Sequence, residues 1–566
     1  MRNFRKPTSR LIGYALVVLF TLFLRASLGE AATVTFRPPT IYAVGTGPTA
    51  VEVADLNGDG KPDLVSANYG SNSVTVLLGN GDGTFQAARN FNAGNSALTF
   101  GVAVGDFNGD GDLDVAVLIP SDGTSPTEVR ILMGNGDGSL QSPVVTTLSS
   151  QETIVACADV NGDKKADLLV NVTSANVAAG IAILLGNGDG TFQNPKIVVA
   201  GPQQTLLAVA DFNHDDVGDL VISLGGAVQI MLNNGDGTFT ATSSSGLADG
   251  YVAGEARTAD LNGDGTPDLI VSSFKYQRCG LFNCTDTRES VFLSGNKGAL
   301  GAEQIIGPGP LFAVGDFDGD GKLDVASRGS TIYPRVTSLV IYPGNGDGTF
   351  AQPTTLATNN NSGALFTSAD LNGDQLTDLV LLDSNGNDVG VVLNSTPAFH
   401  MTASEMSLTL NASGEVTDNI SLTTVNGFSS AIQLSCLVSG PAPAPTCALS
   451  PPDIPAGANS PTVTMTLSAP AQSKLAPGSV LMRTRLLYAM IFALTFAGFI
   501  PGVRRLDLRS VQWLLGIVLG ALLLATIACG GGGSAPRVVP HQQYSVQVTA
   551  KSGALSRTLL VSLTAP

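Results

Sequence analysis

The sequence predicts an all-β protein: a seven-bladed β-propeller followed by a β-sandwich that is interrupted by a transmembrane helical hairpin. Three observations support this fold class. A nine-residue acidic motif recurs seven times at steps of 49 to 56 residues, and so regular a period indicates a repeat architecture. Each repeat contains four short strand patterns, which is the content of one propeller blade. Beyond the last repeat, alternating apolar and polar residues continue on both sides of two long apolar runs.

The acidic motif has oxygen-bearing side chains at positions 1, 3, 5 and 9; its first copy, residues 55–63, reads D-L-N-G-D-G-K-P-D. These side chains can meet at one point only if the chain curls, and Gly58 and Gly60 permit the positive φ that a curl needs. Oxygen ligands at this density suit Ca²⁺, whereas Zn²⁺ would require His or Cys. We therefore expect up to seven Ca²⁺ sites. The expected ligands are Asp55, Asn57, Asp59, Asp63; Asp106, Asn108, Asp110, Asp114; Asp159, Asn161, Asp163, Asp167; Asp211, Asn213, Asp215, Asp219; Asp260, Asn262, Asp264, Asp268; Asp316, Asp318, Asp320, Asp324; and Asp370, Asn372, Asp374, Asp378.

Two alternatives to this calcium hypothesis were weighed. The motif begins like an EF-hand loop, but it has no Glu at position 12, and a strand pattern (Leu64–Ala67) follows instead of a helix. A hairpin turn could use Asn-Gly and Asp-Gly for backbone reasons alone, but a bare turn does not require the Asp that stands at position 9 in every copy.

The copies differ at the glycine positions of the motif. The first, second, fifth and sixth have Gly at position 6, while Lys164, Asp216 and Gln375 replace it in the others. His214 also replaces the Gly at position 4 of the fourth copy. Since Asp tolerates the left-handed region better than Lys or Gln does, the third and seventh loops depart most in backbone terms. The sequence leaves calcium binding at the third, fourth and seventh loops open.

The net charge of −17 arises largely in these loops. The expected ligands include 22 of the 46 acidic residues, and seven Ca²⁺ ions, carrying 14 positive charges, would bring −17 to −3. An acidic surface that calcium neutralises excludes nucleic acid as a partner, since nucleic-acid binding needs basic grooves.

Residues 1–32 are expected to be a secretory signal. Four basic residues precede an apolar run from Leu11 to Leu24, and small residues follow up to Ala32. An uncleaved anchor is the alternative, and in both cases the next segment is exported. Export agrees with calcium binding, because extracellular modules bind Ca²⁺ at roughly 10⁻⁴ to 10⁻³ M.

Each repeat of residues 33–397 is expected to form four strands. In the first repeat they are Ala50–Ala54, Leu64–Ala67, Ser73–Leu78 and a strand from Thr84, with a tight turn at 79–83. The turn recurs in later repeats, and a type I′ hairpin accounts for its single Asp better than a metal site does.

The ends of the array predict a closed ring. The segment Thr35–Ile41 resembles a fourth strand yet precedes the first loop, while the seventh repeat stops at Leu393 without one. The N-terminal strand should therefore complete the last blade, which removes the exposed sheet edges of an open array.

The D-x-N-x-D-G-x-x-D loop and the G-N-G-D-G-T-F turn, over residues 33 to 397, resemble the FG-GAP or VCBS-type repeats of the integrin α-subunit propeller. The resemblance implies Ca²⁺ binding through positions 1, 3, 5 and 9 and through the backbone carbonyl at position 7. That carbonyl falls on Lys61, Asp112, Thr266 and Lys322 in the four copies with Gly at position 6. The family is mostly adhesive or ligand-binding, with some enzymatic members, so the fold alone does not settle function.

Residues 399–475 show period-2 strand patterns between turn residues, as an immunoglobulin-like (Ig-like) sandwich does, and residues 535–566 return to the same pattern. The segment resembles bacterial Ig-like modules with N-G-F-S before a Cys-bearing strand. As exported residues, Cys436 and Cys447 are expected to pair. Cys279 and Cys284 are candidates for a smaller loop in blade five, and Cys157 is expected to be a small buried residue.

Residues 480–528 are expected to form a transmembrane hairpin from the runs Leu486–Ile500 and Val511–Ala528. Three arginines lie between the runs, so the connecting loop should be cytoplasmic. The first run is short for a core of about 30 Å, which leaves open whether it spans fully. Cys529 resembles a lipid-attachment Cys but lacks the Leu expected three residues before it, and its lipidation stays open.

The sequence has few groups suited to acid–base or nucleophilic catalysis. Its three His are His214 in a loop, His400 in the linker after the propeller, and His541 beyond the hairpin. We therefore expect a calcium-stabilised, membrane-anchored extracytoplasmic protein that binds or adheres to an extracellular protein or polysaccharide without catalysis. The loops 68–73, 120–127 and 275–287 should carry recognition. The alternative is a carbohydrate- or phosphodiester-active propeller enzyme, either a lyase or a hydrolase.

Overall fold

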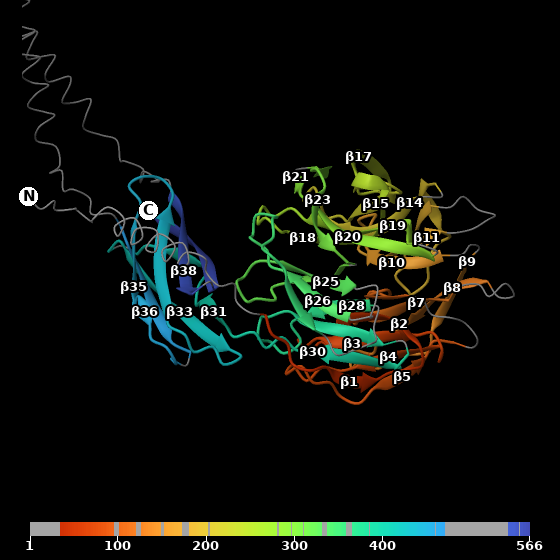
Figure 1. The fold of residues 1–566 in the computed structure, drawn as a ribbon, viewed down its shortest axis with the longest axis horizontal. Coiled ribbons are helices and arrows are strands. Elements are labelled where there is room, and N and C mark those ends of the chain that lie inside the picture. Colours follow the sequence, from red (N-terminus) through yellow and green to blue (C-terminus); the bar gives the residue numbers. More distant parts are fainter. Residues whose placement is uncertain are drawn as a thin grey trace, which may run out of the picture.

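The computed structural model describes residues 34–469 and 542–565, apart from gaps at 95–100, 120–125, 149–151, 173–179, 202–203, 280–281, 296, 310, 331–336, 358–364, 384, 412, 459 and 554 (Figure 1). This part is all-β, with a single 3-10 turn, η1 (Ala248–Gly250). It contains no helix whose length and apolar character would suit a membrane crossing. The expected signal at 1–32, the hairpin at 480–528 and Cys529 lie outside the described residues.

Seven four-stranded antiparallel sheets follow one another along the chain in a propeller-like ring (Figure 1). The first four are β2–β5 (Pro48–Ala54, Asp63–Asn68, Ser73–Leu77, Arg89–Asn92), β6–β9 (Val102–Gly105, Asp114–Ile119, Thr127–Leu132, Val144–Leu148), β10–β13 (Glu152–Ala158, Asp167–Val172, Gly180–Leu184, Lys196–Ala200) and β14–β17 (Gln204–Ala210, Asp219–Leu224, Ala227–Asn233, Phe239–Gly246). The fifth is β18, β19, β20 and β23 (Val252–Ala259, Asp268–Cys279, Phe282–Phe292, Gln304–Pro308), beside a short pair, β21 and β22 (Ser294–Gly295, Ala299–Leu300). The sixth is β24–β27 (Leu311–Gly315, Asp324–Ser330, Thr337–Tyr342, Thr354–Ala357), and the seventh combines β28–β30 (Leu365–Ala369, Asp378–Asp383, Asp388–Val392) with β1 (Thr40–Ala43).

An N-terminal strand closes this ring, but it spans Thr40–Ala43 and not the predicted Thr35–Ile41, of which Phe36 forms only an isolated bridge with Asn394. β1 pairs antiparallel with β30, from Thr40 opposite Val391 to Ala43 opposite Asp388. The first strands of neighbouring sheets contact one another in cyclic order, and β28 of the last sheet contacts β2 of the first. Closure leaves β30 with a partner on both sides, which protects an edge that would otherwise invite pairing with another chain.

The fourth strand of the first sheet begins at Arg89, so the predicted start at Thr84 is wrong. Phe85 forms only an isolated bridge with Gly79 before the ladder is interrupted. The same interruption occurs in the second, third and sixth sheets. In these three sheets a proline, which has no N–H to donate, stands directly before the fourth strand: Pro143, Pro195 and Pro353.

The middle strands of the fifth sheet form a long hairpin, so the loop predicted at Lys275–Thr287 is wrong. β19 and β20 have 12 and 11 residues, and their pairing runs to Cys279 opposite Phe282. In this register Lys275 lies opposite Asp286, while the Lys275 ammonium donates to the carbonyl of Asp249 and Asp286 accepts the hydroxyl of Tyr251. The predicted loop at 68–73 is a turn between β3 and β4, while most of 120–127 lies outside the described residues.

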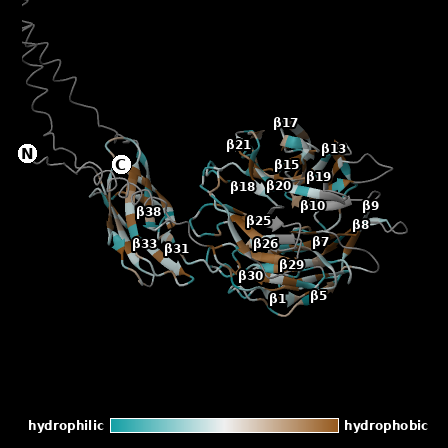
Figure 2. Ribbon diagram, in the orientation of Figure 1, coloured by the Kyte–Doolittle hydropathy of each residue, from teal (hydrophilic) through white to brown (hydrophobic). Residues whose placement is uncertain are grey.

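The cores of the ring lie between neighbouring sheets. One cluster joins buried side chains of the second and third sheets, among them Phe107, Leu118, Leu168 and Leu184. Figure 2 shows the hydrophobic residues concentrated along strands such as β29 and β30. In every sheet the acidic loop joins the first strand to the second, so all seven loops lie at the same end of their sheets.

Residues 398–469 and 542–565, here called the C-terminal sheets, form two sheets around one hydrophobic cluster (Figure 1). The first has the order β31-β33-β37-β35 and the second β32-β39-β38-β34-β36. Their bounds are β31 Ala398–Ala403, β32 Ser407–Thr409, β33 Glu415–Val425, β34 Ile432–Ser439, β35 Thr446–Ser450, β36 Asp453–Ile454, β37 Thr462–Ser468, β38 Gln542–Ser552 and β39 Leu555–Ala565. β38 pairs with β34, which confirms that the last segment of the chain completes the sheets that begin before residue 470.

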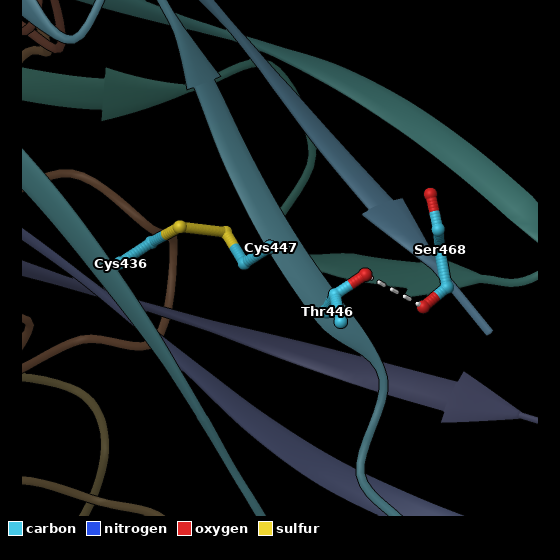
Figure 3. The surroundings of a disulfide bond; sticks show 4 residues. All are labelled: Cys436, Thr446, Cys447 and Ser468. Carbon is cyan, nitrogen blue, oxygen red and sulfur yellow. Dashed lines mark hydrogen bonds between the residues drawn. A yellow bond between two sulfur atoms is a disulfide. The ribbon is translucent and has the colours of Figure 1, made fainter. Parts of the chain in front are cut away.

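A disulfide joins the two C-terminal sheets. Cys436 on β34 is bonded to Cys447 on β35, so the bond connects the five-stranded sheet to the four-stranded one (Figure 3). Cys157 on β10 is free and half-buried, and it packs against the cluster of the second and third sheets. The side chains of Cys279 and Cys284 lie outside the described residues.

Candidate metal centres

The Asp at position 9 of each acidic loop is fully buried and ties the loop to its own sheet. Oδ2 of Asp63 accepts the backbone N–H of Leu56 at 2.9 Å. Its Oδ1 accepts the backbone N–H of Gly79, two residues after the end of β4, at 2.7 Å. The other six bond equivalent pairs: Asp114 (Phe107, Gly134), Asp167 (Val160, Gly186), Asp219 (Phe212, Asn233), Asp268 (Leu261, Ser294), Asp324 (Phe317, Gly344) and Asp378 (Leu371, Asn394). Position 9 therefore has a structural role that the sequence argument did not foresee.

Positions 1, 3 and 5 also accept backbone N–H groups, in one pattern that all seven loops share. Oδ2 of position 1 accepts the N–H of position 6 at 2.7 to 3.0 Å. Oδ1 of position 3 accepts the N–H of position 5 at 2.8 to 3.1 Å. Oδ1 of position 5 accepts the N–H of position 7 at 2.8 to 3.0 Å. The side chains thus turn their oxygens inward, along a curled backbone.

The loops without Gly at position 6 adopt the same backbone. Lys164, Asp216 and Gln375 have φ of 65°, 64° and 62°, and His214 at position 4 has φ of 61°. A non-glycine residue in this region costs about 1 to 3 kcal/mol. The bond from the position-6 N–H to the Asp at position 1 is kept in these loops, and it compensates part of that cost.

The sixth loop brings its carboxylates closest together. Asp316, Asp318 and Asp324 each offer an oxygen, and these oxygens lie within 4.8 Å of one another. Ligand oxygens at 2.3 to 2.6 Å from one Ca²⁺ are at most about 5.2 Å apart, so this set fits a shared calcium ion. No other group of three acidic, His or Cys side chains in the described residues reaches this spacing. Asp320 at position 5 instead pairs with Lys322, at 2.9 Å.

The electrostatics of the loops favour a cation. Burial raises the pKa of every position-9 Asp, that of Asp378 to about 7. Burial and the neighbouring Asp318 raise the pKa of Asp324 to about 8, and burial with Asp320 and Asp316 raises that of Asp318 to about 7. Each shift records the cost of placing negative charge among other carboxylates with little water. A bound divalent cation would remove that cost.

The Asp of the recurring tight turn is used within the turn. Asp82 Oδ1 accepts the N–H and the hydroxyl of Thr84 at 2.9 and 2.5 Å. Asp137, Asp189, Asp236 and Asp347 accept the corresponding N–H in later repeats. These bonds agree with the turn interpretation of this residue.

Two loops contact the C-terminal sheets, a feature absent from the sequence argument. Arg557 on β39 donates from Nη1 to Oδ2 of Asp316 at 2.6 Å, and Asn426 donates to Oδ2 of Asp374 at 3.1 Å.

His400 belongs to β31 and is 5% exposed, so its predicted place in a linker is wrong. Burial, and secondarily Arg557, lowers the pKa of His400 to about 4, and its neutral ring accepts a bond from Arg557 on Nδ1.

The fifth sheet holds a second group of buried charges. Arg288 is 6% exposed, pairs with Glu303 at 2.6 Å, and lies 3.9 Å from the ring centre of Tyr251. Tyr251 donates its hydroxyl to Asp286 at 2.6 Å. Glu289, the residue after Arg288, is fully buried; its carboxylate forms no ion pair among the described residues, and Ser272 is its polar neighbour. No signal in the sequence distinguishes Glu289 from an exposed strand residue.

Glu289→Gln should raise the free energy of unfolding by about 1.4 kcal/mol for each pH unit above about 4.5, because the neutral amide needs no proton in the buried site, whereas the carboxyl does. Burial raises the pKa of Glu289 well above its usual value, so the native state retains a proton that the unfolded chain releases above about pH 4.5. Wild-type stability is therefore lost as the pH rises above that value. Denaturant unfolding between pH 4.5 and 8 should show the variant's advantage growing with pH, while Glu415→Gln, at an exposed residue, should show none. An advantage independent of pH would contradict the argument.

A family model of repeats and several solved structures match parts of this chain. An FG-GAP-like repeat model matches residues 55–117, 211–271 and 316–381. The Dos1 propeller is 11% identical, with a TM-score of 0.35, over 63% of this chain and 95% of that one. An Agrocybe aegerita lectin that recognises non-reducing terminal N-acetylglucosamine is 20% identical, with a TM-score of 0.40, over 56% and 81%. A Photorhabdus luminescens Tc holotoxin pore structure is 14% identical, with a TM-score of 0.34, over 72% and 18%.

Proposed function

We propose that this chain, which carries FG-GAP-like repeats in three regions, is a calcium-stabilised, non-catalytic binding or adhesion protein. In this proposal the ring is a seven-bladed β-propeller exposed outside the cytoplasm, and the C-terminal sheets are an Ig-like sandwich that carries it. The observation that carries the proposal is the single geometry of seven acidic loops, with three carboxylates of the sixth loop within 4.8 Å.

Calcium would bind at the inward-turned oxygens of positions 1, 3, 5 and 9, supplemented by the position-7 carbonyl. The N–H bonds described above use one lone pair of most of these oxygens and leave others free for a cation, since each carboxylate oxygen has two. The ion would supply positive charge that holds the loops in shape. The protein's own residues curl the backbone and tie each loop to its sheet through position 9.

The long hairpin of the fifth sheet is our candidate for recognition. It extends the end of the sheet opposite the acidic loops, and it carries Tyr276, which is 75% exposed and packs edge-on against Phe274. A rigid, exposed aromatic ring suits contact with a protein surface or a polysaccharide. The pair of Tyr251 and Arg288 supports the base of the hairpin.

The test of this function is binding measured together with turnover. Purified full-length protein should bind an extracellular protein or polysaccharide in a pull-down or glycan array, with calcium present, and should release no product from polysaccharides or phosphodiesters. Tyr276→Ser should reduce binding, whereas Val145→Ser, at a 47% exposed residue of the second sheet, should not. Steady turnover that disappears when a carboxylate outside the loops is replaced would instead favour a carbohydrate- or phosphodiester-active enzyme.

Membrane anchoring through residues 480–528 is part of the proposal. β34 and β38 pair although these residues lie between them in sequence, so the chain must return to the side from which it left. An even number of crossings follows. Reporter fusions after Ser510 and after Pro566 should therefore report opposite sides of the membrane, and reporters on the same side would refute the hairpin.

A further inference from the structure

The C-terminal sheets contact the ring at two positions that we assign to calcium ligands. Arg557 pairs with Asp316, position 1 of the sixth loop, and the two side chains are 12% and 14% exposed. Asn426 donates to Asp374, position 5 of the seventh loop. Leu376, position 7 of the seventh loop, is buried in the hydrophobic cluster of the C-terminal sheets. These sheets are therefore built against the candidate metal sites themselves.

The sixth loop differs from the other six in charge. It has Asp318 at position 3, where the others have Asn, so it has carboxylates at all four ligand positions, 1, 3, 5 and 9, and the others have them at three. Arg557 supplies a compensating positive charge and is held in place from its other side. Its Nε donates to the carbonyl of Phe399 at 3.2 Å, and its Nη2 to Nδ1 of His400 at 3.3 Å. The guanidinium is thus fixed beside the loop that has carboxylates at all four ligand positions.

We propose that Arg557 and a calcium ion oppose each other at the sixth loop, so that calcium bound there loosens the contact between the ring and the C-terminal sheets. This inference rests on the calcium binding proposed above. An ion ligated by Oδ2 of Asp316 would lie at most about 5 Å from Nη1 of Arg557, and an ion ligated by Oδ1 at most about 7 Å; two cations at either distance repel each other. Oδ2 of Asp316 already accepts bonds from Gly321 and Arg557, which uses both of its lone pairs.

The seventh loop provides an internal comparison. Its contact with the C-terminal sheets comes from Asn426, a neutral amide that also donates to the carbonyls of Asn394 and Thr396. A neutral donor does not repel a cation, so calcium at this loop should leave the contact in place. We therefore expect calcium and Arg557 to oppose each other at the sixth loop alone. Linkage makes the effect reciprocal: the factor by which calcium weakens the contact between Arg557 and Asp316 is also the factor by which Arg557 weakens calcium binding at this loop.

The first experiment is a calcium titration of the full-length protein by calorimetry. Arg557→Gln removes the charge and should raise the affinity of one site by about tenfold, within the usual range of such couplings. Arg557→Lys keeps the charge and should stay near wild type. Asn426→Ala removes the neutral contact at the same interface and should not produce the gain.

Loop variants assign the gain to the sixth loop. Asp320→Asn weakens the sixth loop and should cancel the effect of Arg557→Gln, whereas Asp264→Asn, at the same position of the fifth loop, should leave it intact. Hydrogen exchange of unmodified protein gives a second readout that does not depend on any variant folding. Amides of β31, beside the carbonyl that Arg557 contacts, should exchange faster when calcium is added, although calcium should slow exchange in the ring.

The outcomes separate this inference from the proposed function. Calcium uptake with no gain in Arg557→Gln, or slower exchange of β31 on adding calcium, overturns the opposition and leaves calcium binding standing. Absence of calcium uptake in every protein overturns both. A gain in Arg557→Gln that Asp320→Asn cancels, together with faster exchange of β31, supports the inference.

Discussion

Removal of calcium with excess EGTA should lower the melting temperature of the ring by roughly 10 °C. If each site is at tenfold its dissociation constant, calcium contributes about 1.4 kcal/mol per site, or about 6 kcal/mol for four sites and 10 kcal/mol for seven. That is comparable with the whole stability of a domain. In a ring of this size, 1 kcal/mol corresponds to roughly 1 to 2 °C.

Calorimetric melts with and without millimolar CaCl₂ measure this effect. Returning Ca²⁺ after chelation should restore the melting temperature, whereas equimolar Mg²⁺ should restore little of it, because Mg²⁺ demands a tighter octahedral site. The C-terminal sheets have no acidic loop of this kind and serve as the internal control. A melt of the ring that is the same in EGTA and in calcium would refute calcium as its stabilising ion.

Asp114→Asn should destabilise the calcium-free protein by about 3 kcal/mol, while Asp110→Asn in the same loop should cost less than about 0.5 kcal/mol. Asp114 is fully buried, and its two oxygens accept the N–H groups of Phe107 and Gly134 at 2.9 and 2.7 Å. An amide offers one oxygen, so one buried N–H loses its acceptor and faces another donor. Asp110 is exposed, and Asn preserves the oxygen that accepts the N–H of Asp112.

Denaturant unfolding in EGTA measures these costs, and a calcium titration then separates the two roles of the loop. Both variants should bind calcium more weakly, because both remove a carboxylate ligand. The structural cost should appear only in Asp114→Asn. Equal destabilisation of the two variants without calcium would contradict the structural role assigned to position 9.

The acidic loops were predictable because their geometry is local. Each oxygen at positions 1, 3 and 5 accepts an N–H only two to five residues further along the chain, so the spacing of the motif encodes the curl. The N-terminal strand was predictable for a different reason. A repeat array with a leading fourth strand and no closing one has a single way to pair all its edges.

The ends of strands and the contacts of single residues were harder to predict from the sequence. Position 9 appeared to be a metal ligand, yet its partner after the third strand, such as Gly79 for Asp63, is set by the register of a sheet and not by the motif. The long hairpin of the fifth sheet was mistaken for a loop, since its polar residues carry no strong strand pattern. His400 was placed in a linker, because its burial depends on packing against elements distant in sequence.

The sequence by itself determined the repeat number, the all-β content and the position of every acidic loop, because these follow from periodicity and from bonds between near neighbours. It distinguished the seven loops only by the residues at their glycine positions. Only the tertiary structure decided that the sixth and seventh loops meet the C-terminal sheets, and that Arg557 reaches Asp316 across 241 residues. That choice depends on the packing of Leu376, from the seventh loop, in the hydrophobic cluster of the C-terminal sheets, and a repeating pattern contains no information about which of its copies will lie at such a contact.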